Sequence, residues 1–481
     1  MHEPRHLIDG ALTTSATTFD IINPATEEVI GQAPDGTAAD LDAAIGAARR
    51  AFDDTTWSTD VDFRLHCLSQ LHQALVDQGE SMRALTTAEG GAPAFATAGP
   101  AYDVPVAGLE WLINATRDYA WETDLGIASP MGVKSHRIVR REATGVVAAI
   151  TPWNFPNQIN LAKVAPALAA GNTVVLKPAP DTPWVAAELG RIAAEKTDIP
   201  AGVLNVVTTA SNQVAAALTT DPRVDLVSFT GSTATGRAIM AAAAPTLKRV
   251  FLELGGKSAA IVLDDADLGS AIGTAAFSVC IHAGQGCALT TRLVVPRAKY
   301  DEAVEMAASI MASIGCGDPL DPGTLCGPVI SASQRDRIEG YLALAREEGG
   351  TFATGGTRPD RDRGFWVAPA VIAGLDNTAR VAREEIFGPV LTVLAHDGDD
   401  DAVRIANDSE YGLSGAVSSA DPERARAVAR RIRTGTIAVN GGVWFSPDAP
   451  FGGYKQSGIG REMGVAGLEE YLQIKTMAEG V

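Results

Sequence analysis

The sequence has little of what metal sites, disulfide scaffolds and nucleic-acid-binding surfaces need. It contains five cysteines, none in a CxxC pair, and seven scattered histidines, so we expect neither a structural metal nor a disulfide framework. The formal net charge is −19 and no run is rich in lysine or arginine, which argues against nucleic acid and an anionic membrane as partners. No window has the length of an apolar transmembrane helix, and the first twenty residues contain no apolar signal region. Unpaired cysteines are typical of a reducing compartment, so we expect a cytoplasmic protein.

The pattern that is present is an alternation of strands and helices. At 481 residues, with 46% hydrophobic and 20% charged residues, the chain should form a globular protein of two or three domains. After a mainly helical first third, continuous apolar strands alternate with helices, which predicts a parallel sheet covered on both faces. A second block of the same kind begins near residue 259. The expected helices are 38–53, 61–77, 79–90, 101–120, 158–170, 183–196, 266–281, 298–314, 332–348, 399–407 and 421–432.

Residues 122–142 fit neither block. They show strand-like alternation and end in a basic cluster. One interpretation is a surface hairpin. The other is an arm that pairs with a second subunit, whose strand edge would otherwise need protection.

Two reactive side chains, Glu253 and Cys287, stand in the stretch 251–292, each beside glycines. Glu253 ends the strand-like run VFLEL. Cys287 follows the bend 284–286, Gly-Gln-Gly, where we expect the missing side chains to let a substrate approach the backbone. A cysteine at such a bend suits covalent attack on a carbonyl carbon, with its own N–H receiving the oxyanion. Taken alone, a purely structural cysteine is an equally good interpretation.

Residues 228–240, SFTGSTATGRAIM, predict a strand, a glycine turn and a helix. Arg237 and Ala238 replace the Lys and Ser/Thr of a Walker A loop, and the spacing is not G-x-G-x-x-G, so neither standard nucleotide loop is present. A helix N-terminus that follows Gly231 and Ser232 can still hold a pyrophosphate. The alternative is a tight turn without a ligand. Lys177, at the end of another strand, has the reach for the ribose of a nucleotide at the sheet edge.

Seven motifs occur in an order that closely resembles the aldehyde dehydrogenase superfamily, over nearly the whole chain from INPAT at 22–26 to LEEYLQIKT at 468–476. They are TPWNFP at 151–156, LKP at 176–178, FTGST at 229–233, LELGGK at 252–257, GQGC at 284–287, EEIFGPV at 384–390 and PFGGYKQSGIGRE at 450–462.

The resemblance implies an α/β fold with two parallel-sheet domains and a small β oligomerisation arm. The cofactor-binding domain would comprise residues 1–121 and 143–255, and the catalytic domain residues 256–469. Residues 122–142 and 470–481 would form the oligomerisation element of a homodimer or homotetramer.

The resemblance also implies roles for individual residues. Cys287 would attack the aldehyde, Asn154 and the Cys287 N–H would hold the oxyanion, and Glu253 would activate the water that hydrolyses the thioester. Lys163 matches a lysine near the active site of relatives. Since a free thiol is mostly protonated near neutral pH, we expect the surroundings of Cys287 to activate it.

The cofactor that the resemblance implies is NAD, with NADP possible. Relatives that prefer NAD often carry a glutamate three residues after the strand-end lysine, and Pro180 takes that place here. By resemblance, Lys177 contacts the adenine ribose, Gly231 and Ser232 the pyrophosphate, and Glu385 the nicotinamide ribose. The cofactor contacts carried over are Thr151, Pro152, Trp153, Lys177, Pro178, Pro180, Gly231, Ser232, Leu254, Gly255, Glu385 and Phe387.

Substrate clues are few. By resemblance, the segments that line the aldehyde tunnel contain Phe155, Ala162, Trp111, Trp444, Phe445 and Phe451. No Arg or Lys marks a substrate carboxylate, which favours an apolar or aromatic aldehyde, unless these aromatics only pack the core. Glu253 favours hydrolysis over acyl transfer to coenzyme A. Coenzyme A-dependent acylation and a catalytically silent nucleotide-binding relative are the alternatives.

Overall fold

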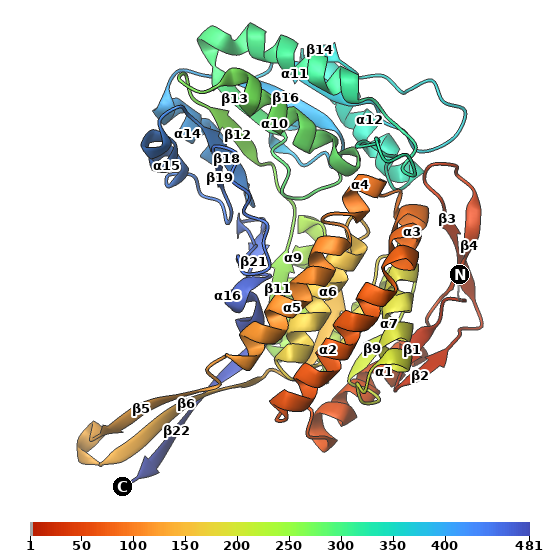
Figure 1. Cartoon of the computed structure of the whole chain (residues 1–481), viewed down its shortest axis with the longest axis vertical. Coiled ribbons are helices and arrows are strands. Elements are labelled where there is room, and N and C mark those ends of the chain that lie inside the picture. Colours follow the sequence, from red (N-terminus) through yellow and green to blue (C-terminus); the bar gives the residue numbers. More distant parts are fainter. Residues whose placement is uncertain (1–2) are drawn as a thin grey trace.

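The computed structural model describes residues 3–481, which fold into two α/β lobes and a projecting arm (Figure 1). Residues 1 and 2 of the predicted first domain lie outside the described residues. Each lobe has its own central sheet and its own buried apolar cores.

The lower lobe in Figure 1 is built on a sheet in the order β2-β1-β9-β8-β7-β10-β11-β21. The five central strands are parallel, and β1, β2 and β21 are antiparallel additions at the edges. All residues of β8 are buried, as expected for a strand between two helical layers. The strands are β1 (His6–Ile8), β2 (Ala11–Thr13), β7 (Val146–Ile150), β8 (Thr173–Lys177), β9 (Leu204–Val206), β10 (Leu226–Thr230), β11 (Arg249–Glu253) and β21 (Gly458–Ile459).

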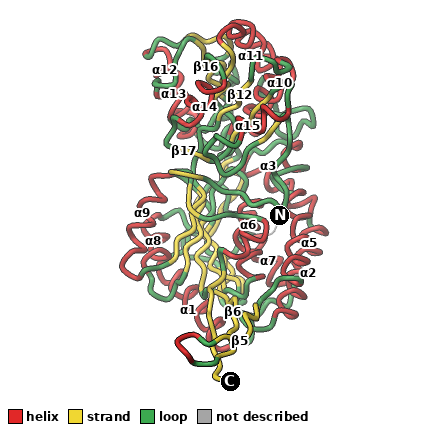
Figure 2. Tube along the Cα trace, turned by 90° about the vertical axis from the view of Figure 1, so that its left-hand side faces the viewer, coloured by secondary structure: helices red, strands yellow, loops and turns green. Residues whose placement is uncertain are grey.

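Helices cover both faces of this sheet. Figure 2 shows α8 and α9 on one side of the strands and α2, α5 and α7 on the other. The first helix begins with a reciprocal capping box between Thr37 and Asp40, which explains where the chain turns from strand to helix. The helices are α1 (Ala38–Asp54), α2 (Val61–Asp77), α3 (Gly79–Gly90), α4 (Ala94–Thr97), α5 (Asp103–Arg117), α6 (Pro156–Ala169), α7 (Trp184–Lys196), α8 (Asn212–Thr220) and α9 (Thr233–Ala243).

The upper lobe contains the second sheet, in the order β14-β15-β16-β13-β12-β18-β19. All its pairings are parallel except that of the edge strand β14. Its strands are β12 (Ala259–Val262), β13 (Arg292–Pro296), β14 (Thr351–Thr354), β15 (Ala370–Ala373), β16 (Val390–His396), β18 (Gly415–Ser418) and β19 (Ala438–Val439). Its helices are α10 (Leu268–Cys280), α11 (Tyr300–Ile314), α12 (Ala332–Glu347), α13 (Arg380–Arg383), α14 (Asp399–Asn407) and α15 (Pro422–Ala429).

The predicted arm is a three-stranded antiparallel sheet that projects from the lower lobe (Figure 1). It consists of β5 (Glu122–Ala128), β6 (Ser135–Ala143) and the C-terminal strand β22 (Leu472–Gly480). The strand character of 122–142 is therefore confirmed.

The chain crosses back to the lower lobe after the second sheet. Strand β21 pairs with β11 of the first sheet, and α16 (Gly464–Glu469) packs against α6. Two small antiparallel pairs complete the fold, β3 (Thr18–Ile22) with β4 (Val29–Pro34) and β17 (Tyr411–Gly412) with β20 (Tyr454–Lys455). Within residues 3–481, no helix combines the length and apolar character needed to cross a bilayer.

Candidate active site

The carboxyl ends of the parallel strands in the lower lobe bring the predicted residues to one edge of the sheet. In the pairing of β7 with β8, Ile150 faces Lys177, and in the pairing of β10 with β11, Thr230 faces Glu253. Asn154 follows β7 by four residues and precedes α6. This is the edge at which open α/β sheets bind ligands.

Cys287 is half-buried and follows a turn, Ile281–Gly284, whose backbone is held in an unusual conformation. His282 and Ala283 have φ values of 48° and 54°, and Gly284 has a φ of 71°. Non-glycine residues adopt such values at a cost of about 1–3 kcal/mol, so the surroundings must hold the turn. The buried Gln285 does so, because its Oε1 accepts from Ile330 N at 2.9 Å and its Nε2 donates to His282 O at 3.1 Å.

The prediction that Gly284 leaves room for a substrate beside the backbone is wrong. A β-carbon there would lie 2.2 Å from the carbonyl of Gly388, so the space beside Gly284 is filled by the chain itself and not left for a substrate. A β-carbon on Gly256 would likewise lie 2.6 Å from the Cys287 carbonyl oxygen. Both glycines allow backbones to pack closely and thereby fix the cysteine next to the LELGGK segment.

Asn154 is hydrogen-bonded to the residue that follows the same turn. Its Nδ2 donates to Gln285 O at 2.9 Å, and its side chain is buried. This contact places a neutral N–H donor beside the segment that leads to Cys287. An amide donor in this position suits an oxyanion that develops next to the cysteine.

Glu253 is a buried carboxylate without a partner. It is 2% exposed, and within residues 3–481 neither of its oxygens has a hydrogen-bond partner. Burial raises its pKa well above the ordinary value, and the nearby Glu462 raises it further, while Lys163 opposes the shift. A carboxyl group with a raised pKa and no fixed partner has the properties of a general base.

The expectation that the protein surroundings activate the Cys287 thiol is wrong. Burial raises the pKa of Cys287 far above the ordinary value, and the carboxylates of Glu385 and Glu253 add to this effect. The negative charges near the thiol disfavour its thiolate. Ionisation of Cys287 therefore needs a group that accepts its proton.

Lys163 belongs to a buried polar network close to Glu253. Its Nζ donates to Glu462 Oε1 at 2.8 Å and to Ser228 Oγ at 3.1 Å, and Ser228 Oγ lies 3.0 Å from the Tyr471 hydroxyl. Lys163 thus acts on the charge balance at Glu253. Glu462 belongs to this network and was not singled out from the sequence, although it ends the motif PFGGYKQSGIGRE.

Comparison with known proteins decides the family. The sequence profile of the aldehyde dehydrogenase family matches residues 12–477. The chain belongs to the aldehyde dehydrogenase family. It is accordingly an oxidoreductase that oxidises aldehydes with reduction of NAD(P)+.

Known relatives cover almost the full length of this aldehyde dehydrogenase. It is 45% identical over 469 residues to 3-succinoylsemialdehyde-pyridine dehydrogenase of a Pseudomonas species, with 96% of this chain and 95% of the relative covered. It is 41% identical over 466 residues to geranial dehydrogenase of Castellaniella defragrans, with 96% and 95% covered. A crystal structure of a betaine aldehyde dehydrogenase mutant from Staphylococcus aureus, with NAD+ and a BME-modified cysteine, superposes with a TM-score of 0.96 at 37% identity. It covers 99% of this chain and 96% of that one, which confirms the predicted fold class.

Several features of the aldehyde dehydrogenase fit a dinucleotide. Ser232 caps α9, its Oγ accepting from Thr235 N at 3.2 Å, so Gly231 leads into a helix whose first N–H groups have no partner within the helix. Lys177 ends β8 as a buried ammonium. Burial lowers its pKa to about 8, and Asp181 opposes the shift.

The segment around Glu385 forms a second wall of this site. Gly255 is so close that a β-carbon on it would lie 2.3 Å from Glu385 Oε2, and Gly256 N donates to Glu385 Oε1 at 2.9 Å. Burial raises the Glu385 pKa to about 6. Trp153 packs edge-on against Phe387, with ring centroids 5.3 Å apart.

The remaining predicted cofactor contacts lie on the same strand ends. Leu254 is buried and packs under α9, where a β-carbon on Gly236 would lie 2.8 Å from it. Thr151 Oγ1 donates to Asn160 Oδ1 at 2.7 Å. Pro152 follows β7, whereas Pro178 and Pro180 follow β8.

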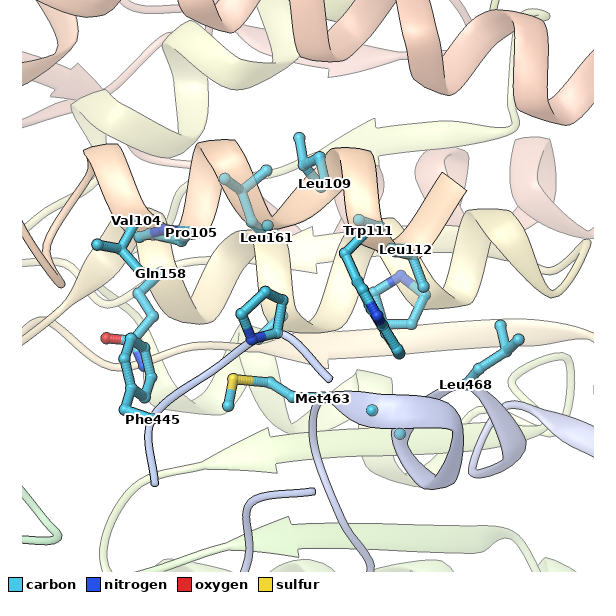
Figure 3. A pocket seen from close by; sticks show the side chains of 17 residues that line it. Val104, Pro105, Leu109, Trp111, Leu112, Gln158, Leu161, Phe445, Met463 and Leu468 are labelled. Atoms are coloured by element: carbon cyan, nitrogen blue, oxygen red, sulfur yellow. The ribbon is translucent and has the colours of Figure 1, made fainter. Parts of the chain in front are cut away.

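The predicted tunnel residues divide into two groups. Phe445 and Ala162 line one cavity, together with Trp111 (Figure 3). Trp444 stacks on Phe451 at 5.3 Å instead. Phe155 packs edge-on against His282, with centroids 5.4 Å apart. Of these aromatics, Phe155 is the one that contacts the turn before Cys287.

Because the role predicted for Asn154 is to donate to the oxyanion, replacing Asn154 with alanine should lower kcat by about 10²–10³-fold. The KM for the aldehyde should change much less. Steady-state kinetics measure both values. Loss of the bond to Gln285 O also leaves a buried carbonyl unpaired, so the thermal stability of the variant should be measured as well. If the fall in kcat only matched the fraction of unfolded protein, a role in oxyanion binding would be contradicted.

Proposed function

We propose that this enzyme oxidises an aldehyde to the carboxylic acid through a thioester on Cys287. The observation that supports this most strongly is the unpartnered, buried carboxylate of Glu253 behind the Cys287 turn. A carboxylate is costly to bury without partners, and its retention points to a role in the reaction.

The first step is attack by the Cys287 sulfur on the carbonyl carbon, while the thiol proton leaves to a base. Cys287 is half-buried, so water at the site accepts that proton and Glu253 stays free for the hydrolysis step. The carbonyl oxygen becomes an oxyanion that accepts hydrogen bonds from Asn154 Nδ2 and the Cys287 N–H. The product of this step is a thiohemiacetal.

In the second step the thiohemiacetal is oxidised to a thioester. NAD(P)+, when bound, supplies the hydride acceptor for this step. The residues that would hold it are those at the N-terminus of α9, at the end of β8 and around Glu385. Glu253 then takes a proton from water as the oxygen of that water attacks the thioester carbon, and the acid leaves as the Cys287 thiol re-forms.

NAD is the cofactor we propose, with NADP possible. Pro180 carries no carboxylate, yet Asp181 lies near enough to Lys177 to oppose the lowering of its pKa. A negative charge there would repel a 2′-phosphate.

The presence of Glu253 favours hydrolysis over acyl transfer to coenzyme A. Incubation with NAD+ and an aldehyde panel, without coenzyme A, should yield NADH and carboxylic acid in equal amounts. Acid formation only when coenzyme A is present would establish the acylating alternative. Nucleotide binding without turnover of any aldehyde would establish a silent relative.

We further propose that the enzyme is a cytoplasmic homodimer or homotetramer assembled through the arm. The arm carries apolar side chains that are exposed in the single chain, including Leu125, Ile127, Val133 and Ile474. We also propose a cofactor-binding part, 1–121 and 143–255, and a catalytic part, 256–469. The two separate central sheets support this division, although β21 and α16, within 458–469, pack on the first lobe.

Activity should rise with pH, because Cys287 and Glu253 must lose protons and the pKa of each is raised. Glu462→Gln removes a negative charge beside Glu253 and leaves the opposing charge of Lys163. The Glu253 pKa should therefore fall. The pH below which thioester hydrolysis slows, its acid limb, should then move to a lower value.

The measurement is the rate of acid release after a single turnover, as a function of pH. Glu469→Gln, at an exposed carboxylate on the same segment, is the matched control and should leave the profile unchanged. An acid limb at the same pH in both variants would contradict coupling between Glu462 and Glu253.

A further inference from the structure

Three of the five cysteines come together in the apolar core of the upper lobe. Cys280 ends α10, Cys316 follows α11 by two residues, and Cys326 lies in the loop between α11 and α12. Cys280 and Cys326 are buried, whereas Cys316 is half-buried. None of the three takes part in the mechanism proposed above.

Cys316 and Cys326 are in direct contact. Gly317 N donates to Cys326 O at 3.0 Å, which joins the two backbones next to the cysteines. The Cys326 thiol is a hydrogen-bond donor to the Cys316 sulfur, and this contact lowers the pKa of Cys316 and raises that of Cys326. Two cysteines joined in this way are within the reach of a disulfide, which then draws the sulfurs from contact to bonding distance.

Cys316 has the properties of a reactive thiol. Its pKa is lowered by the Cys326 contact and further by the positive charge of Arg361, whereas the pKa of each of the other four cysteines is raised. Arg361 is held in place, since its Nη2 donates to Cys316 O at 2.6 Å and its guanidinium lies 4.4 Å from the centre of the Trp366 ring. A partly exposed thiolate beside an arginine is the form of cysteine that reacts with peroxides.

The loop that carries Cys326 also supports the turn before the nucleophile. Leu325 O accepts from His282 N at 3.1 Å. Further along the loop, Ile330 N donates to Gln285 Oε1 at 2.9 Å. These bonds hold the strained residues of the turn, so a displacement of Cys326 reaches the nucleophile through one short segment.

We propose that Cys316 and Cys326 form a reversible disulfide when a peroxide oxidises the enzyme, and that this disulfide slows aldehyde oxidation. The Cys316 sulfur attacks one oxygen of the peroxide, the O–O bond breaks, and Cys316 becomes a sulfenic acid while the other oxygen leaves as water or an alcohol. The Cys326 sulfur then attacks the sulfenic sulfur, and the hydroxyl group leaves as water with the Cys326 proton. The two thiols thus lose two electrons to the peroxide, and a dithiol reverses the change.

The loss of activity rests on the proposed function, because it acts through the turn that precedes the nucleophile. Formation of the disulfide does not depend on that function. Because a misplacement of about 1 Å in an active site costs up to about a hundredfold in rate, kcat should fall by between about tenfold and a hundredfold.

The first experiment looks for the disulfide in the full-length enzyme. Reduced enzyme is treated with a stoichiometric amount of hydrogen peroxide, alkylated with iodoacetamide and digested. No Lys or Arg lies between the two cysteines, so trypsin leaves both on one peptide, residues 300–335, which should be two hydrogen atoms lighter and unalkylated. Cleavage before Asp318 and Asp321 should then leave the outer fragments joined until a dithiol is added. Alkylation of both cysteines, or a bond from either of them to Cys280, would overturn the inference.

The second experiment measures kcat for one aldehyde before and after the same treatment in the native enzyme, Cys316→Ser and Cys326→Ala. Cys67→Ala is the matched control, because Cys67 is a buried thiol on α2 in the other lobe. The native enzyme and the control should lose activity and regain it with dithiothreitol, whereas the other two variants should keep their untreated kcat. Cys326→Ala carries the test alone if Cys316→Ser does not fold.

Equal losses in all four proteins would show that the peroxide acts on Cys287 and would overturn the inference. A disulfide between Cys316 and Cys326 that leaves kcat unchanged would overturn its effect on the turn. Absence of aldehyde turnover in the untreated native enzyme would instead count against the proposed function.

Discussion

Replacing Cys287 with alanine should lower kcat by about 10⁴-fold or more, whichever aldehyde is used. Without the sulfur no thiohemiacetal forms, and the oxyanion donors alone have no nucleophile beside them. The residues at the N-terminus of α9 and the end of β8 are unchanged, so binding of NAD+ measured by calorimetry should keep its affinity. Initial rates of NADH formation measure the loss.

Cys316→Ala is the matched control, because Cys316 is also a half-buried free thiol but lies in the second lobe, where it donates to Val367 O. Its activity should stay close to that of the native enzyme. Native activity in Cys287→Ala, or equal losses in both variants, would show that the chemistry lies elsewhere.

Replacing Glu253 with glutamine should separate the two halves of the reaction. Oxidation to the thioester should still give one NADH per active site, whereas steady-state turnover should fall by about 10²–10⁴-fold, because no carboxylate takes the proton from water. Glutamine fits the same space and removes the buried unpartnered charge, so the fold should be retained. Rapid mixing with NAD+ and aldehyde measures both the burst and the slow phase.

The exposed carboxylate of Glu410 provides the control, since Glu410→Gln makes the same chemical change at the surface. If Glu253→Gln turned over at the native rate, another base would have to activate the water. If the burst itself disappeared, Glu253 would be needed already when Cys287 loses its proton.

The sequence predicted the scaffold well, because parallel strands between helices are continuous apolar runs. Strands that end in Lys177 and Glu253 lie where their pattern placed them. The edge strand β21, with only two residues in a glycine-rich segment, has no pattern of its own and was missed. Its pairing with β11 depends on tertiary contacts.

The environment of the site was harder to predict. The close packing of Gly284 on Gly388 joins segments about a hundred residues apart, which no local pattern reveals. The raised pKa of Cys287 results from burial and from carboxylates on three different segments. The cavity beside Ala162 likewise requires two helices and the segment 445–468 to meet.

The most direct test of the central claim is to trap the acyl enzyme. Glu253→Gln, mixed with NAD+ and a straight-chain aldehyde and quenched in acid, should gain the mass of the aldehyde less two hydrogen atoms. After proteolysis the added mass should lie on the peptide that contains Cys287. An unmodified Cys287 peptide after the NADH burst, or an acyl group on another cysteine, would contradict the mechanism.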